Sequence, residues 1–258
     1  MGILNVTPDS FSDGGQWLVR SEAVQHALSI QAAGADIIDV GGESTRPGAK
    51  AVPLQQELDR VIPLIEAIVP RLCIPVSIDT SKPEVMREAV AAGAGMINDV
   101  YALRLDGAVS AAVDLGVPVC LMHMQGEPRV MQDNPVYKNV AAEVRHFLLE
   151  RAKRCEEAGM LAHTIVLDPG FGFGKTLQQN IALFQSLPDL VATGYPVLVG
   201  ISRKAMIGSL TGRDLPGRIP GSVTAAVLAV QAGAAIIRVH DVAETLDALK
   251  VATALSPG

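Results

Sequence analysis

Polar side chains recur at the ends of apolar segments throughout this 258-residue sequence. The clearest case is Asp168, which follows the apolar residues 165–167 and precedes the glycine-rich segment 169–174. An apolar run without polar alternation is typical of a strand that is covered on both faces, as in parallel α/β sheets. We therefore expect Asp168 to lie at the carboxyl end of a buried strand, where such folds place their chemistry.

The same arrangement of an apolar segment, a polar residue and a helical segment occurs eight times. The other strand-end residues are Asn5, Asp39, Asp79, Asn98 with Asp99, His123, Ser202 with Arg203 and Lys204, and Arg238 with His240. Helices are expected over residues 21–33, 54–69, 140–158, 222–231 and 243–252, and glycines 34, 93, 159 and 233 should end helices. Eight alternations in about 250 residues predict an α/β fold, a (β/α)8 TIM barrel that forms a single domain over residues 1–258.

Composition excludes several classes of protein. The formal net charge of -6 argues against a nucleic-acid surface, which needs clustered lysine and arginine. Charges and prolines interrupt every apolar stretch well before the roughly 18 residues that a membrane span requires. The three cysteines (Cys73, Cys120 and Cys155) have neither disulfide nor metal-ligand spacing, which favours a cytoplasmic location. The first strand begins at the first residues, without a preceding segment to cover the lower end of the barrel, so we expect an effect on stability rather than on chemistry.

The long segment after the first strand is expected to act as a lid. Residues 6–15 are polar and turn-rich, without a helical period, and loops of this length are usually functional or disordered. Residues 41–48 combine glycines, which permit close approach of a ligand, with Ser44, Thr45 and Arg46, which can hold an anion.

Other polar residues have simpler interpretations. Ser81 and Glu84 have the spacing of a capping box, which is a purely structural role. His123 is credible as a buried core histidine, and the absence of a His-x-His pair near Asn5 argues against a zinc hydrolase. The segment 170–176 approaches a nucleotide-binding P-loop, but Pro169 stands where that motif requires glycine.

The strand-end residues divide by charge. Asp79, Asn98 and Asp168 lie on middle strands and can accept hydrogen bonds from a flat heterocycle that is rich in N–H donors. A second group lies near the seam where the eighth strand should meet the first, and it suits a diphosphate: Asn5, Arg46, Arg238 and His240.

Five segments in this order resemble the dihydropteroate synthase family: residues 1–15, 41–48, 168–173, 202–204 and 238–240. The resemblance covers the chain from end to end. It implies a folate-biosynthesis transferase that joins 6-hydroxymethyl-7,8-dihydropterin diphosphate to 4-aminobenzoate and releases diphosphate. It also implies that the protein is a sulfonamide target. It also implies a homodimer that forms through covering helices of the second half.

The resemblance further implies roles for individual residues. The pterin is held by Asp79, Asn98, Asp168 and Lys204, with Arg238 stacked on its ring. The diphosphate and Mg2+ are bound by Asn5, Thr45, Arg46, Arg238 and His240, with Asn5 as the metal ligand. The lid after the first strand and a second lid over residues 41–52 would close over the reacting centre. The 4-aminobenzoate is then framed by Phe11, Arg46, Pro47, Phe173, Ser202 and Lys204. Because an electron-rich dihydropterin can stabilise a cation at its exocyclic methylene, the implied substitution is dissociative and needs no strong nucleophile.

Three alternatives remain open at this point. A pterin-binding methyltransferase barrel could share the Asp and Asn contacts but would not need the 44–48 segment. A Schiff-base aldolase would use Lys204 as its nucleophile, with a lowered pKa. A non-catalytic pterin-binding barrel would bind ligand without turnover.

Overall fold

The computed structural model describes residues 1–6, 15–44, 49, 51–126, 131 and 135–256. Strands β1 to β6 form one parallel sheet in chain order, and β7 pairs in parallel with β8. The eight strands of the described chain are β1 (Gly2–Asn5), β2 (Ile38–Gly41), β3 (Val76–Asp79), β4 (Met96–Asp99), β5 (Val119–Met122), β6 (Ile165–Asp168), β7 (Leu198–Val199) and β8 (Ile236–Ile237).

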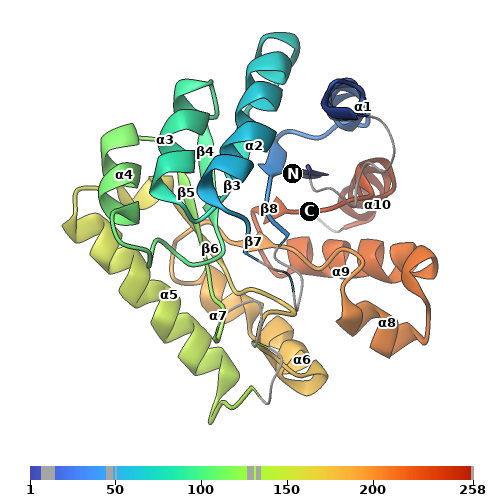
Figure 1. Ribbon diagram of the computed structural model, residues 1–258. Helices are drawn as coiled ribbons and strands as arrows, with labels where there is room; N and C mark the ends of the chain where they lie inside the picture. Colours follow the sequence, from blue (N-terminus) through green and yellow to red (C-terminus); the bar gives the residue numbers. More distant parts are fainter. Residues whose placement is uncertain (7–14, 45–48, 50, 127–130, 132–134, 257–258) are drawn as a thin grey trace.

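Two parallel bridges join these sheets into a closed barrel. Leu167 of β6 pairs with Val197, just before β7, and Gly2 of β1 pairs with Val239, two residues after β8. The chain therefore forms the predicted (β/α)8 barrel, with helices arranged around the strands (Figure 1). The helices are α1 (Gly15–Ala32), α2 (Leu54–Ile68), α3 (Pro83–Ala91), α4 (Ala108–Leu115), α5 (Val140–Glu157), α6 (Leu177–Gln185), α7 (Leu187–Val191), α8 (Ala205–Thr211), α9 (Ile219–Gln231) and α10 (Val242–Leu255).

The barrel interior is packed rather than open. Its lower part holds a cluster of Met1, Met96, Cys120, Val166 and Leu198, which lies apart from the larger core between strands and helices. The amino terminus of Met1 donates a hydrogen bond to the Ile237 carbonyl at 3.0 Å. The first residue is thus part of the barrel. Within the described ranges, the structure contains no helix with the length and apolar character needed to cross a bilayer.

Some local predictions are confirmed and others are wrong. The glycines at 34, 93, 159 and 233 follow helices with φ between 94° and 111°, as predicted. Helix α1 begins at Gly15 rather than near residue 21, and α9 begins at Ile219 rather than at 222. Pro220 explains the second difference, because proline is favoured in the first turn of a helix.

The capping box predicted for Ser81 and Glu84 is wrong. Helix α3 begins at Pro83, its N-cap residue is Lys82, and no side chain caps it. The Ser81 hydroxyl instead donates to the buried carboxylate of Asp99. The hydrogen bond from the Ser81 hydroxyl to a buried carboxylate is stronger than the hydrogen bond the hydroxyl would make as a helix cap. Pro83, in the first turn, already favours the start of the helix at this position.

Candidate active site

Three of the predicted site residues lie in one row across adjacent strands. Asn5 pairs with Gly41, Gly41 with Asp79, and Asp79 with Asn98. The row continues into Cys120, which belongs to the interior cluster, so the row faces the inside of the barrel. A Cβ at Gly41 would lie 3.5 Å from the Asn5 Oδ1 and 3.6 Å from the Asp79 Oδ2, so Asn5 and Asp79 flank this glycine.

Arg238, from the end of β8, reaches two carboxylates on other strands. Its Nε donates to the Asp39 Oδ2 at 2.6 Å and its Nη2 donates to the Asp79 Oδ2 at 2.8 Å. Burial opposes the charge on Arg238, but Asp39 and Asp79 outweigh it and hold its pKa above the ordinary value. Burial raises the pKa of Asp79, and Arg238 opposes that shift. The sequence predicted one group of acceptors for a heterocycle and a separate group for a diphosphate. The two groups are not fully separate, because Arg238, which was assigned to the diphosphate group, binds the acceptor Asp79.

Asp39 is a site residue to which the sequence assigned no role. Its side chain is fully buried, and its Oδ2 also accepts a hydrogen bond from the Asn98 Nδ2 at 2.9 Å. Asp39 thus holds both Asn98 and Arg238. The sequence feature that could have predicted this role is the position of Asp39 within an apolar strand, because a buried carboxylate requires hydrogen-bond or charge partners.

Asp168 ends β6 and is held by the turn that follows it. The Gly170 N–H donates to its Oδ1 at 2.7 Å, and Gly170 has a φ of 67°. Burial raises the pKa of Asp168, an effect opposed first by Lys204. Position 170 requires glycine because its φ is positive and because a Cβ there would lie 2.0 Å from the His123 carbonyl oxygen.

Lys204 joins this turn to the beginning of α8. Its Nζ donates to the Phe171 carbonyl and lies 4.5 Å from the centroid of the Phe173 ring, a cation–π contact. Burial lowers the pKa of Lys204 to about 8, while Asp168 opposes the shift. Asp168, Phe173 and Lys204 are therefore brought together as predicted.

His240 and Ser202 lie together near the seam between the eighth strand and the first. The Ser202 hydroxyl accepts from the His240 N–H at 3.1 Å and lies 3.1 Å from its Nδ1. Ser202 is buried and His240 is exposed. Four predicted site residues lie outside the described residues: Phe11, Thr45, Arg46 and Pro47. Residues 7–14 of the first predicted lid and residues 45–48 and 50 of the second also lie outside them.

Charged side chains hold the segment that leads to residues 45–48. The Lys82 Nζ binds Glu43 and Glu57 at 2.5 Å each, and Glu57 is buried. The Thr80 hydroxyl donates to the other oxygen of Glu57 at 2.6 Å. Lys82, which follows β3, therefore links Glu43 to Glu57 in the first turn of α2.

His123 is a buried core histidine, as its simpler interpretation predicted. Its ring makes an edge contact with Phe147, with centroids 5.0 Å apart. Burial, followed by the charge of Lys175, lowers the pKa of His123 to about 3. The histidine is therefore neutral at physiological pH. Among the described residues, no group of three or more His, Cys, Asp or Glu side chains could hold a metal ion.

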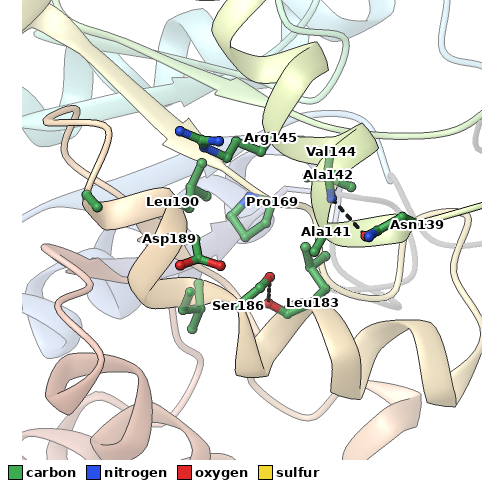
Figure 2. Close-up of a pocket in the computed structure, with 12 residues that line it drawn as sticks. Asn139, Ala141, Ala142, Val144, Arg145, Pro169, Leu183, Ser186, Asp189 and Leu190 are labelled. Atoms are coloured by element: carbon green, nitrogen blue, oxygen red, sulfur yellow. Dashed lines mark hydrogen bonds between the residues drawn. The ribbon is translucent and has the colours of Figure 1, made fainter.

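A cavity of about 340 Å3 lies on the outside of the barrel, between α5 and the pair α6 and α7. Figure 2 shows Arg145 from α5 facing Asp189 and Leu190 from α7 across this cavity, with Pro169 between them. Pro169 follows Asp168, but the side chain of Asp168 does not line the cavity. The cavity is separate from the strand-end site.

Comparison with known proteins agrees with this geometry. The family model for pterin-binding enzymes matches residues 1–240. The chain is 53% identical to the dihydropteroate synthase of Escherichia coli K12, covering 98% of this chain and 90% of that protein. It is 51% identical to the dihydropteroate synthase of Haemophilus influenzae, with coverage of 97% and 91%.

Solved structures give the same result. The chain superimposes with a TM-score of 0.94 on the Xanthomonas albilineans dihydropteroate synthase with 4-aminobenzoic acid, at 56% identity over 100% of this chain and 93% of that one. The TM-score is 0.90 for the same organism's enzyme in complex with 7,8-dihydropteroate, at 52% identity and coverage of 100% and 94%. It is 0.93 for the Yersinia pestis enzyme with a sulfonamide drug complex, at 50% identity and coverage of 98% and 92%. The chain belongs to the dihydropteroate synthase family of pterin-binding enzymes.

Proposed function

We propose that this protein joins 6-hydroxymethyl-7,8-dihydropterin diphosphate to 4-aminobenzoate and releases diphosphate and 7,8-dihydropteroate. The observation that carries the proposal is the set of acceptors inside the barrel mouth, Asp79, Asn98 and Asp168, with Lys204 and Arg238 bound among them. Residues 1–258 would act as one catalytic domain. Relatives of 50% identity or more have been solved with 4-aminobenzoic acid, with 7,8-dihydropteroate and with a sulfonamide, so we also propose that this protein is a sulfonamide target.

The buried carboxylates would bind and orient the pterin. Asp168 and Asp79 can each accept N–H bonds from the ring, and hydrogen bonds to charged groups contribute about 1.5 to 3 kcal/mol each. Asn98 is already oriented by Asp39, which fixes its amide nitrogen and leaves its carbonyl oxygen as an acceptor. Such fixed acceptors lower the entropy cost of aligning the pterin with its partner.

The departing diphosphate would be stabilised at the seam between β8 and β1. His240, Asn5 and Arg238 lie there among the described residues, and Thr45 and Arg46 complete the proposed set. A preorganised positive environment stabilises charge that develops on a leaving group. The aminobenzoate nitrogen would then attack the methylene, with Phe11, Pro47, Phe173 and Ser202 around the ring, and the two lids would exclude water.

We further propose that Asn5 is a ligand of Mg2+. The described residues fit this ion, because Asn5 ends a strand with an amide oxygen beside Gly41, and Mg2+ prefers oxygen ligands. One protein oxygen is not a complete site. The ion would depend on substrate phosphate oxygens and water for most of its coordination, which is common for Mg2+. When bound, it would neutralise charge on the diphosphate.

The test is diphosphate release by the purified protein with Mg2+ and the dihydropterin diphosphate, with and without 4-aminobenzoate. We expect release that depends on 4-aminobenzoate and a product with the mass of 7,8-dihydropteroate. Ligand binding without product would overturn the proposal in favour of a binding protein. Methyl transfer from a methyl donor would favour the methyltransferase alternative, which the similarity to dihydropteroate synthases does not favour.

We also propose a homodimer and a cytoplasmic location. Exposed apolar side chains on α8, α9 and the 3-10 turn between them support a dimer through these elements: Leu210, Leu215, Leu228 and Val230. Light scattering should give twice the 27.0 kDa chain mass, and Leu228→Glu should reduce it to one chain. A monomeric parent protein would disprove the dimer. The three free cysteines support a reducing compartment.

A further inference from the structure

Lys175 is a buried lysine for which the proposed reaction has no use. It follows the glycine-rich turn 170–174, and only 3% of its surface is exposed. Within the described part of the chain, none of its hydrogen bonds goes to a carboxylate. Its Nζ contacts the Gly170 carbonyl at 2.8 Å, the Phe173 carbonyl at 3.0 Å and the His123 Nδ1 at 3.1 Å.

These three shortest contacts match the three N–H donors of one ammonium group, and the His123 carbonyl lies farther from the Nζ, at 3.5 Å. The Phe173 N–H also donates to the Gly170 carbonyl at 3.1 Å, so Lys175 bonds to both ends of this tight turn. The pairing requires His123 to accept through Nδ1, which a neutral imidazole can do. The edge contact with Phe147 holds that imidazole in place.

The turn that Lys175 holds carries groups of the site. Its Gly170 N–H binds Asp168, its Phe171 carbonyl accepts from Lys204, and its Phe173 ring lies against the Lys204 ammonium. Two ammonium groups therefore bind carbonyls of one short turn, Lys204 at its middle and Lys175 at both of its ends. An error of about 1 Å in a group that positions a substrate can cost on the order of 100-fold in rate.

We propose that Lys175, supported by His123, is a positioning residue that sets the Gly170–Phe173 turn, and through Phe173 and Lys204 the 4-aminobenzoate side of the site. The inference rests on the proposed function. Pterin binding depends less on Lys175, because Asp79 and Asn98 lie on β3 and β4, away from the turn, and Asp168 ends strand β6, although Gly170 also donates a hydrogen bond to it. Lys175 touches no reacting atom and is therefore not a catalytic residue.

The experiment compares Lys175→Met, which keeps the length of the side chain without its charge, with Leu148→Ala. Leu148 is a fully buried residue of α5, and its truncation destabilises the fold without altering the turn. We expect Lys175→Met to raise the KM for 4-aminobenzoate about tenfold and to leave the Kd for the pterin within about twofold. Leu148→Ala should lower Tm and leave both constants unchanged. An unchanged KM in Lys175→Met, with a lowered Tm, would overturn the proposal.

Hydrogen exchange of peptides that cover residues 170–175 gives a second readout, independent of turnover. We expect faster exchange there in Lys175→Met than in Leu148→Ala, and equal exchange in the two variants would also overturn the proposal. If Lys175→Met does not fold, His123→Phe replaces it, because this change removes one acceptor and keeps an aromatic ring. In His123→Phe, hydrogen exchange over residues 170–175 should be faster and the KM for 4-aminobenzoate higher than in the parent protein. If neither changes, the inference is contradicted. If the parent protein forms no dihydropteroate, the proposed function fails, whereas the exchange result still decides whether Lys175 holds the turn.

Discussion

The Arg238 Nε lies 2.6 Å from the Asp39 Oδ2, a contact between residues 199 positions apart in the chain. It joins the end of β8 to β2 across the barrel mouth. Asp39 is fully buried, and it also accepts a hydrogen bond from Asn98. One carboxylate therefore orients two residues to which the proposed reaction assigns pterin contacts.

Asp39→Ala should destabilise the protein by about 3 kcal/mol, because it removes one of the two carboxylates that pair with Arg238 and takes away the acceptor of the Arg238 Nε. It also leaves the Asn98 amide without its acceptor. The matched control is Asp114→Ala, which removes the acceptor of the exposed Arg87–Asp114 pair and should cost less than about 1 kcal/mol. Urea unfolding measures both changes, and equal losses would contradict the importance of the buried pair.

Gly170→Ala should cost more than about 3 kcal/mol and abolish activity, because the new Cβ would meet the His123 carbonyl oxygen at 2.0 Å. Gly116→Ala is the control. Gly116 has a nearly equal φ of 65° with nothing within 4 Å of a Cβ, so only the left-handed strain of about 1 to 2 kcal/mol applies. Thermal unfolding separates the two variants. Similar losses would show that backbone strain alone decides the cost.

Asp168→Asn should weaken pterin binding at least about 100-fold, because the amide accepts hydrogen bonds more weakly than a buried carboxylate. Titration calorimetry with a pterin measures the loss. Asp189→Asn, at an exposed position on α7, should bind the pterin as the parent does. Retained affinity in Asp168→Asn would remove Asp168 from the proposed pterin site.

Arg46→Ala should reduce turnover of the pterin diphosphate about 100-fold, the effect of removing one donor to developing charge. Binding of a pterin without diphosphate should stay within about twofold. Steady-state kinetics and calorimetry together test the assignment. An equal loss in both measurements would show that Arg46 does not act on the diphosphate.

The stability of the parent relative to Lys175→Met should rise with pH. Burial lowers the pKa of Lys175 to about 7, with Asp168 opposing the shift and Lys204 adding to it, whereas an unfolded lysine titrates near 10.4. Between these values the unfolded chain binds more protons, so the free energy of unfolding rises with pH. His123, the third titratable group that faces Lys175, is neutral throughout this range. The difference in Tm between the two proteins should therefore grow from pH 6.5 to pH 9, and a constant difference would contradict a buried, titrating lysine.

The sequence alone determined the barrel and most of the positions around its mouth. Apolar segments that end in Asn5, Asp79, Asn98 or Asp168 are local patterns, and the carboxyl ends of parallel strands meet at one face. Glycine at the ends of helices is also a local signal, and it predicted the positive φ at Gly34 and Gly93 correctly.

Only the tertiary structure decided which of these groups pair. Asp39 and Arg238 are joined by closure of the barrel, which no spacing in the sequence encodes. Ser81 bonds to Asp99 rather than to its own helix because β4 brings a buried carboxylate beside it. Lys175 appeared in the sequence as part of a failed P-loop pattern, and its role emerged from the carbonyls that the folded turn directs at it. Local patterns specify strands and turns, whereas partners for buried charges depend on contacts between distant segments.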